Sequence, residues 1–257
     1  MHSEKRIEKQ VTIELETARW TAEELQRKVQ ELKPRVAVFD CDGTLWDGDS
    51  GLGFMAWSME QGLVSRSTSD WIDTRHRAYR AGAVSEVQIC GEMVQIYAGL
   101  RETELREAAA RYVSEFVTPR IFKEIAQLVT ELRASGAELW AVSSTNKWVI
   151  AEGVRAFGIA EERVLAAEAA VADGLITSIL VNVPTDEGKA AALRGVGLIR
   201  PDAVFGNSIH DLAMLEMAAN AFPVNPSPAL LQQAARHRWG WFRPTGAEGV
   251  LSDIVGK

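Results

Sequence analysis

The sequence predicts an α/β protein with a mainly parallel sheet and an inserted block of helices. From about residue 118 onward, short apolar strands alternate with helices, a pattern typical of parallel sheets with right-handed crossovers. One earlier apolar run, Val36-Ala37-Val38-Phe39, also has the character of a buried strand. Residues 50–117 contain helical patterns and no comparable strand. We therefore expect a core of residues 35–49 and 118–257, with residues 50–117 as a helical cap over the strand ends.

Residues 1–34 are expected to form an N-terminal helical extension. Thr21-x-x-Glu24 has the capping-box pattern. Apolar residues at helical spacing follow it, and Pro34 closes the helix. Residues 7–15 fit the spacing of a helix and that of a strand equally well.

The inserted segment is expected to contain a series of helices. Glycines end the first three, because glycine accepts the left-handed conformation that often closes a helix. Ser85-x-x-Gln88 is a cap for the third. The expected spans are about 52–61, 69–80, 86–98 and 103–116.

The rest of the core is expected to alternate helix and strand. Thr118-Pro119 offers an N-cap followed by a proline at the first helical position, so a helix should begin there. Asp173-Gly174 predicts a small hairpin, and Trp239 and Trp241 predict a last edge strand. The expected strands lie near 138–142, 163–166, 203–206 and 221–224, and the expected helices near 119–134, 146–157, 187–194, 209–218 and 227–236.

Composition and charge exclude several classes of function. The 257 residues include 28 basic and 35 acidic side chains, a formal charge of −7, which disfavours unaided binding to nucleic acid or anionic lipid. Apolar runs are too short to span a bilayer, and the N-terminus lacks the apolar stretch of a signal peptide. We therefore expect a cytoplasmic protein with no nucleic-acid or membrane partner. The sequence does not determine its oligomeric state.

Two carboxylates follow the first core strand directly. Asp40 and Asp42 are two residues apart, and Gly43-Thr44 turns the chain after them. Side chains two apart on a strand face the same way, so both should point into the crevice at the strand end. Converging carboxylates repel each other unless a cation or a shared proton intervenes, and Mg²⁺ prefers such oxygen ligands. A plain turn is the alternative interpretation, since Asp and Gly favour turns on their own.

Further polar residues follow later strands in the order that a shared sheet edge requires. Ser143 and Ser144 end a strand, where hydroxyl and N–H groups can hold a phosphate. Lys189 lies near the start of a helix, and Asn207 and Asp211 follow the fourth core strand. Each has a plainer interpretation alone, as a helix cap or a solvated side chain. At the ends of successive parallel strands, they are hard to explain as caps together.

This set of residues resembles that of the haloacid dehalogenase-like hydrolase superfamily, in its phosphoserine-phosphatase-like branch. The resemblance covers about residues 35–255 and implies a Rossmann-like core of sheet order 3-2-1-4-5 with an inserted helical cap. It also implies a Mg²⁺-dependent phosphatase acting on a small phosphate ester. It rests on Asp40-Cys41-Asp42-Gly43-Thr44, Ser143, Lys189 and Gly206-Asn207-Ser208-Ile209-His210-Asp211.

The resemblance implies a role for each matched residue. Asp40 would be the nucleophile that forms an aspartyl-phosphate, and Asp42 would protonate the leaving oxygen and then deprotonate the attacking water. The Asp40 carboxylate, the Asp42 backbone carbonyl and the Asn207 side chain would hold Mg²⁺. Ser143 and the N–H of Ser144 would bind phosphoryl oxygens. Lys189 would offset the negative charge on Asp40 and the phosphoryl group. Asp211 would orient Lys189 or metal-bound waters.

The chain departs from the family pattern at two places. Asn207 stands where the family commonly has a metal-binding aspartate, so one negative charge is missing. In the cap, Asp49 matches an acidic residue that phosphoserine phosphatases use for the substrate amine, but Glu92 lies near the register of their carboxylate-binding arginine. We therefore expect phosphate esters with a cationic head, such as phosphoethanolamine or phosphocholine, to be preferred over phosphoserine. Asp49, Glu92 and the aromatic face of Trp46 would select the head.

Two alternatives use the same core. A phosphotransferase or mutase differs mainly in whether the cap admits water, and a catalytically weak phospho-ligand-binding protein is compatible with the missing charge at Asn207.

Overall fold

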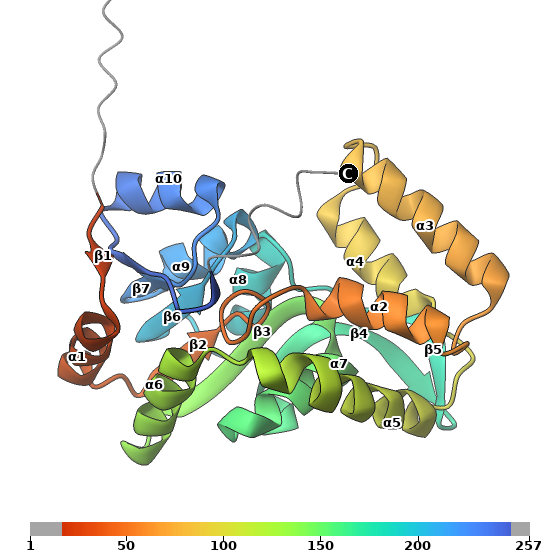
Figure 1. The fold of residues 1–257 in the computed structure, drawn as a ribbon, viewed down its shortest axis with the longest axis horizontal. Helices are drawn as coiled ribbons and strands as arrows, with labels where there is room; N and C mark the ends of the chain where they lie inside the picture. The colour runs from red at the N-terminus through yellow and green to blue at the C-terminus, as the bar shows by residue number, and fades with distance from the viewer. Residues whose placement is uncertain (1–16, 248–257) are drawn as a thin grey trace, which may run out of the picture.

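The computed structural model describes residues 17–247, so the ambiguous pattern in residues 7–15 lies outside the described part. Within it, the main sheet has six strands in the order β5-β4-β3-β2-β6-β7, parallel except for the β4–β5 pair (Figure 1). The expected order 3-2-1-4-5 is confirmed, with β5 added at one edge. The strands are β2 (Val36–Phe39), β3 (Glu138–Asn146), β4 (Val164–Ala172), β5 (Leu175–Asn182), β6 (Ala203–Gly206) and β7 (Ala221–Pro223).

Helices cover both faces of this sheet, so the central strand is buried on both sides. Ala37 and Phe39 face one apolar core, and Val38 faces a second, as the twofold alternation of a strand requires. The first core is closed by α1 (Ala22–Leu32), α6 (Lys123–Ala134) and α7 (Lys147–Val154); the second by α8 (Glu187–Gly195), α9 (Leu212–Met217) and α10 (Pro228–His237).

The expected small hairpin is much longer than the sequence indicated. Asp173 and Gly174 both have positive φ at its turn, as the hairpin pattern predicts. The strands on either side run well beyond the expected 163–166, since they also support the inserted helices: Leu180 packs directly against Gly91.

The inserted segment is helical, as expected, and its helices are α2 (Ser50–Glu60), α3 (Arg66–Arg80), α4 (Glu86–Gln95) and α5 (Glu102–Tyr112). Ser85 caps α4 by accepting a hydrogen bond from the N–H of Gln88. The last helix ends earlier than expected, because residues 113–117 widen into a π-helical turn. In Figure 1, α2 and α5 lie alongside α7, while α3 and α4 stand out at the upper right.

The expected helix start at Thr118-Pro119 is wrong. Those residues form a short 3₁₀ turn, and α6 begins only at Lys123. The reason is a tertiary pairing: Ile121 lies antiparallel to Trp46, and neighbouring backbone groups on both sides form hydrogen bonds. The two chain crossings between core and insertion therefore run side by side.

The N-terminal part described is a short strand and a helix. Thr21 and Glu24 form both halves of the expected capping box on α1. Before it, β1 (Arg19–Trp20) pairs in parallel with β8 (Trp241–Phe242) as a separate small sheet. The expected last strand is therefore present as β8, and Phe242 also forms one parallel bridge to Val224, directly after β7.

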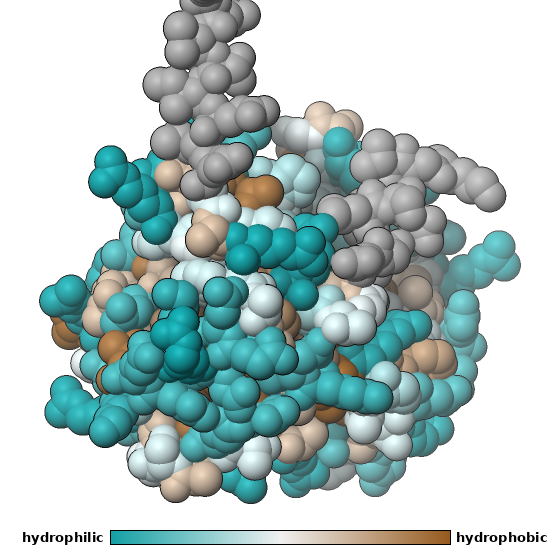
Figure 2. Space-filling view, turned by 60° about the vertical axis from the view of Figure 1, so that its left-hand side comes forward, coloured by the Kyte–Doolittle hydropathy of each residue, from teal (hydrophilic) through white to brown (hydrophobic). Residues whose placement is uncertain are grey.

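Among the described residues, no helix has the length and apolar character needed to cross a membrane. The face shown in Figure 2 is mainly hydrophilic, with small scattered apolar patches.

Candidate active site

The carboxyl ends of three adjacent strands bring the candidate residues to one edge of the sheet. The central strand β2 pairs with β3 on one side and β6 on the other. Asp40 and Asn207 directly follow β2 and β6, Ser143 lies in the carboxyl-terminal half of β3, and all three line one cavity of about 300 Å³. Lys189 lines the same cavity from α8. The structure thus gathers side chains that lie far apart in the sequence.

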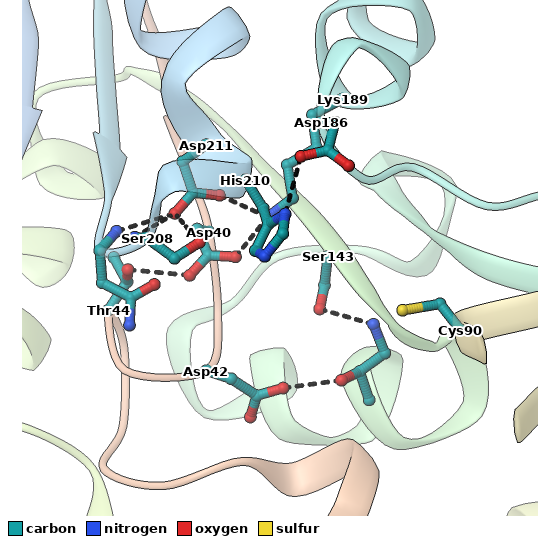
Figure 3. Close-up of polar contacts among 12 residues, drawn as sticks. Asp40, Asp42, Thr44, Cys90, Ser143, Asp186, Lys189, Ser208, His210 and Asp211 are labelled. Atoms are coloured by element: carbon teal, nitrogen blue, oxygen red, sulfur yellow. Dashed lines mark hydrogen bonds and ion pairs between the residues drawn. The ribbon is translucent and has the colours of Figure 1, made fainter. Parts of the chain in front are cut away.

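A buried group of three charges forms the centre of this site (Figure 3). Lys189 Nζ lies 2.7 Å from Asp40 Oδ1 and 2.5 Å from Asp211 Oδ1. The three side chains are at most 7% exposed. The second oxygen of Asp211 accepts hydrogen bonds from the N–H groups of Asn207 and Ser208. Asp211 therefore holds Lys189 in place, and with both carboxyl groups ionised the three side chains together carry one negative charge.

Burial determines how these groups titrate. Burial and the nearby Asp211 raise the pKa of Asp40 to about 7, although Lys189 acts in the opposite direction. Burial alone would lower the pKa of Lys189, but the two carboxylates outweigh it and raise that pKa above its usual value. Lys189 therefore stays charged, and the negative charge on Asp40 is incompletely balanced.

Backbone geometry aims Asp40 into the cavity. Thr44 Oγ1 donates to Asp40 Oδ2 at 2.9 Å, and the Asp40 N–H donates to the Phe205 carbonyl. Gly43 has a φ of 76°, and a Cβ there would collide with Asn207 Nδ2. A glycine is required at this point because the Asn207 amide packs directly against the loop.

Asp42 lies beside the cavity and accepts three hydrogen bonds. Trp46 Nε1 and the Ser50 N–H donate to its Oδ1, and Thr145 Oγ1 donates to its Oδ2, each at 2.7 Å. These three donors orient the Asp42 carboxyl group and tie it to the start of the insertion.

Trp46 does not present its ring to a ligand. It is 1% exposed and its ring packs against Gly153 and Phe157. Its expected role in substrate selection is therefore incompatible with its position, and its indole N–H instead orients Asp42.

Ser143 and Ser144 lie where phosphoryl oxygens could be bound. Ser143 is buried, and its Oγ accepts a hydrogen bond from the Thr145 N–H at 3.1 Å. Ser144 lines the same cavity as Asp40 and also a second, adjoining one.

The adjoining cavity has a volume of about 610 Å³ and lies between the insertion and β3. Asp49, Ser144 and Thr145 line both cavities, so the two lie side by side there. Asp49 caps α2 by accepting from the Leu52 N–H at 2.8 Å. Although Asp49 is exposed to solvent on one side, desolvation by the surrounding protein and the neighbouring Asp42 raise its pKa to about 6.

Glu92 does not line this cavity. Arg75 binds it with two hydrogen bonds of 2.8 Å each, so its charge is already balanced within the insertion. Glu86, on the same helix α4, lines the cavity instead. Sequence reasoning missed Glu86, because helical spacing indicates which residues share a face but not which face meets the core.

The oxygen groups near Asp40 have the chemistry of a magnesium site. Within residues 17–247, no three or more His, Cys, Asp or Glu side chains gather as a metal site, so a bound ion would need other donors. A carboxylate, an amide oxygen and a backbone carbonyl are available at Asp40, Asn207 and Asp42, and hard oxygen donors suit Mg²⁺.

Comparisons with known proteins agree with this geometry. Residues 37–216 match the family model of haloacid dehalogenase-like hydrolases. A probable phosphatase of Mycobacterium tuberculosis is 26% identical over 211 residues, which cover 79% of this chain and 73% of that protein. A histidinol-phosphatase of Neisseria meningitidis is 25% identical over 214 residues, 79% of this chain and 96% of that one.

Solved structures share the fold. A Bordetella pertussis protein of unknown function has a TM-score of 0.72 at 24% identity, covering 81% of this chain and 98% of that one. A substrate-bound phosphoserine phosphatase has a TM-score of 0.55 at 16% identity, covering 78% and 90%.

The chain belongs to the haloacid dehalogenase-like hydrolase family. Its fold is that of the phosphoserine phosphatases in this family. It is an enzyme of the phosphatase type, a hydrolase of phosphoric monoesters.

Proposed function

We propose that this protein hydrolyses a small phosphomonoester, with Mg²⁺ bound, through an aspartyl-phosphate on Asp40. The buried group of Asp40, Lys189 and Asp211 at the end of the central strand is the observation that carries this proposal. It holds a carboxylate and a permanent positive charge within reach of one phosphoryl group. The phosphatases among the relatives support the reaction class.

The first step transfers the phosphoryl group to the enzyme. An oxygen of Asp40 forms a bond to phosphorus, the bond from phosphorus to the ester oxygen breaks, and Asp42 gives its proton to that departing oxygen. The Ser143 hydroxyl and the Ser144 N–H bind the equatorial phosphoryl oxygens. Lys189 offsets the charge that accumulates between Asp40 and the phosphoryl group.

The second step returns the enzyme to its starting state. Asp42, now a carboxylate, takes a proton from a water molecule whose oxygen attacks phosphorus. The bond between phosphorus and Asp40 breaks, and inorganic phosphate leaves. For Asp42 to serve in both steps, its Oδ2 must exchange the hydrogen bond from Thr145 for one to the ester oxygen or to water.

Magnesium fits this site on the charge of the residues present. The raised pKa of Asp40 reflects its burial together with negative charge that Lys189 does not fully balance. The Asp40 carboxylate, the Asp42 backbone carbonyl and the Asn207 amide oxygen would hold the ion. When bound, Mg²⁺ supplies positive charge that reduces the repulsion between the nucleophile and a phosphate dianion.

The inserted residues 50–117 would act as the cap that encloses the leaving group. Hydrolysis of p-nitrophenyl phosphate, measured with Mg²⁺ and after chelation, tests the proposal. We expect turnover that depends on Mg²⁺ and a phosphorylated enzyme that can be trapped by acid quench. Turnover unaffected by chelation, or the absence of any phosphoenzyme, would contradict it.

A catalytically weak phospho-ligand-binding protein is the second candidate. Asn207 favours it, because an amide in place of a carboxylate reduces the negative charge that attracts the ion. The same assay separates the two candidates: this one predicts phosphate binding with negligible turnover. A phosphotransferase would instead transfer the phosphoryl group to an added alcohol in preference to water.

Replacement of Asp42 by asparagine should slow alkyl phosphates far more than p-nitrophenyl phosphate. The amide can keep the hydrogen bonds from Trp46 and Ser50, but it cannot donate an acidic proton to a poor leaving group. General acid catalysis contributes about 10²–10⁴-fold, and an activated leaving group needs little of it. Comparing kcat/KM for the two esters measures the difference. Equal losses on both would argue against the acid role.

Replacement of Asn207 by aspartate should tighten Mg²⁺ binding. It adds a charged oxygen ligand, an effect on the order of 1–3 kcal/mol, the scale of an interaction with a charged group. Calorimetric titration of Mg²⁺ measures it, and Asn207→Leu should shift the affinity in the opposite direction. Unchanged or weaker binding in the aspartate variant would place residue 207 away from the ion.

A further inference from the structure

The larger cavity contains two carboxylates whose charge is not balanced. Asp49 lines both this cavity and the smaller one that contains Asp40, and Glu86 lies in the first turn of α4. The two are close enough that Glu86 contributes to the raised pKa of Asp49. In the described part of the chain, neither lies within ion-pair distance of a lysine or arginine, in contrast to Glu92 on the same helix, which Arg75 neutralises.

The two oxygens of Glu86 have different surroundings. Oε1 accepts a weak hydrogen bond from the Cys90 thiol at 3.5 Å. Oε2 is buried, and no hydrogen-bond donor reaches it from the described residues. His210 Nε2 lies 3.9 Å from Oε2, beyond hydrogen-bond distance, and His210 already pairs through Nδ1 with Asp186 at 2.7 Å. A buried carboxylate oxygen without a donor is costly, so this atom is free to bind a ligand's donor.

The basic side chains that line the cavity do not neutralise Asp49 or Glu86. Burial lowers the pKa of His76, which favours its neutral form. Arg80, from the last turn of α3, also lines the cavity, but it is exposed to solvent and lies beyond ion-pair distance of Asp49 and Glu86. The interior of the cavity is therefore acidic, and it adjoins the place where Lys189 and the Ser144 N–H would bind a phosphoryl group.

The positions of the aromatic side chains indicate which kind of ammonium group the cavity could bind. A choline-like head is usually held by several aromatic faces. Trp46 is buried away from the cavity, Trp57 packs against Phe54 and Tyr112, and Trp71 does not line it. Tyr79 is the aromatic side chain that lines it, and its hydroxyl lies close to Glu86. A primary ammonium, with three N–H donors, matches these oxygens better than a quaternary one.

We propose that the substrate is the phosphate ester of an amino alcohol, whose primary ammonium lies between Asp49 and Glu86. This inference rests on the proposed phosphatase function and names its substrate class. It replaces Glu92 by Glu86 as the selecting carboxylate, and it excludes phosphocholine from the preferred esters. The volume of about 610 Å³ and the apolar side chains of Leu52, Ile89 and Met93 in the lining leave space for a further group on the carbon chain.

A matched pair of esters tests the proposal. 2-Aminoethyl phosphate and 2-hydroxyethyl phosphate have the same size, and only the first carries an ammonium. We expect a ratio of kcat/KM values of about tenfold to a hundredfold in favour of the amine, the scale of one charged hydrogen bond. Phosphocholine should rank below 2-aminoethyl phosphate. 2-Amino-3-phenylpropyl phosphate should be accepted at least as well as 2-aminoethyl phosphate.

Two near-isosteric variants assign the effect to residues. Glu86→Gln and Asp49→Asn should each reduce the amine-to-hydroxyl ratio to within about threefold of unity. Asparagine is as good an N-cap as aspartate, so Asp49→Asn should leave α2 intact, and thermal unfolding checks both variants. Glu107→Gln, on the exposed side of α5, is the control and should keep the wild-type ratio.

The outcomes separate this proposal from the function on which it rests. A wild-type ratio near unity, with Mg²⁺-dependent hydrolysis of p-nitrophenyl phosphate intact, overturns the amino-alcohol proposal and leaves the phosphatase function standing. A preserved ratio in Glu86→Gln overturns the assignment to Glu86. Absence of hydrolysis of every ester, p-nitrophenyl phosphate included, overturns both.

Discussion

Asp40→Asn is expected to reduce phosphatase turnover by at least about a thousandfold, the scale on which loss of a catalytic nucleophile is felt. The amide has nearly the same shape as the carboxylate: its oxygen can keep the contact with Lys189, and its NH2 group can donate to Thr44 Oγ1. It cannot form an aspartyl-phosphate, because the amide is a poor nucleophile and lacks the negative charge. Initial rates with p-nitrophenyl phosphate under saturating Mg²⁺ measure the loss.

The fold of this variant should survive. Asp40 and Asp211 repel each other across Lys189, so neutralising one of them leaves the other fully paired. Mass spectrometry should exclude deamidation, which would restore the wild-type residue. Retention of more than a few per cent of the rate in the intact Asp40→Asn variant would exclude Asp40 as the nucleophile.

Lys189→Met should destabilise the protein strongly as well as inactivate it. Methionine fills a similar volume, but it leaves Asp40 and Asp211 buried side by side without a cation. Breaking a buried ion pair by removing one partner costs about 3–5 kcal/mol. Urea unfolding measures the free energy of unfolding, and the variant should also lose phosphate-ester turnover.

Lys147→Met is the matched control for this prediction. Lys147 also binds a carboxylate, Glu168, at 2.9 Å, but both side chains are partly exposed. Its removal should cost no more than about 1 kcal/mol. Adding Asp211→Asn to Lys189→Met should recover part of the lost stability, because one unpaired charge disappears. If the two lysine variants lose equal stability, the buried charges are not what makes Lys189 important.

The gathering of the candidate residues in one cavity was predictable because strand ends do not depend on fine packing. Asp40, Ser143 and Asn207 each end or directly follow a short apolar run, and parallel strands bring such positions to one edge whatever the helices around them do. Lys189 was harder to place, since a helix start by itself does not show which strand it faces. Its order in the chain supplied the missing information.

The substrate side of the site was less accessible to sequence reasoning. Glu86 and Glu92 lie on the same helix, and the pattern alone does not show which of them turns toward β3. Arg75, which neutralises Glu92, lies on a different helix, and no local rule pairs the two. Trp46 was misjudged for a similar reason: aromatic side chains near a site are as suited to support it from behind as to face it.

Because Trp46 and Ile121 pair where the chain leaves and re-enters the core, the segment between them can change in evolution without altering the core. Both ends of the insertion leave the core at one place, joined by backbone hydrogen bonds that belong to the core. The spacing of those ends is therefore independent of what lies between them. Insertions, deletions or substitutions in this segment could therefore change the preferred leaving group, while the sheet and the residues at its carboxyl edge stay in place.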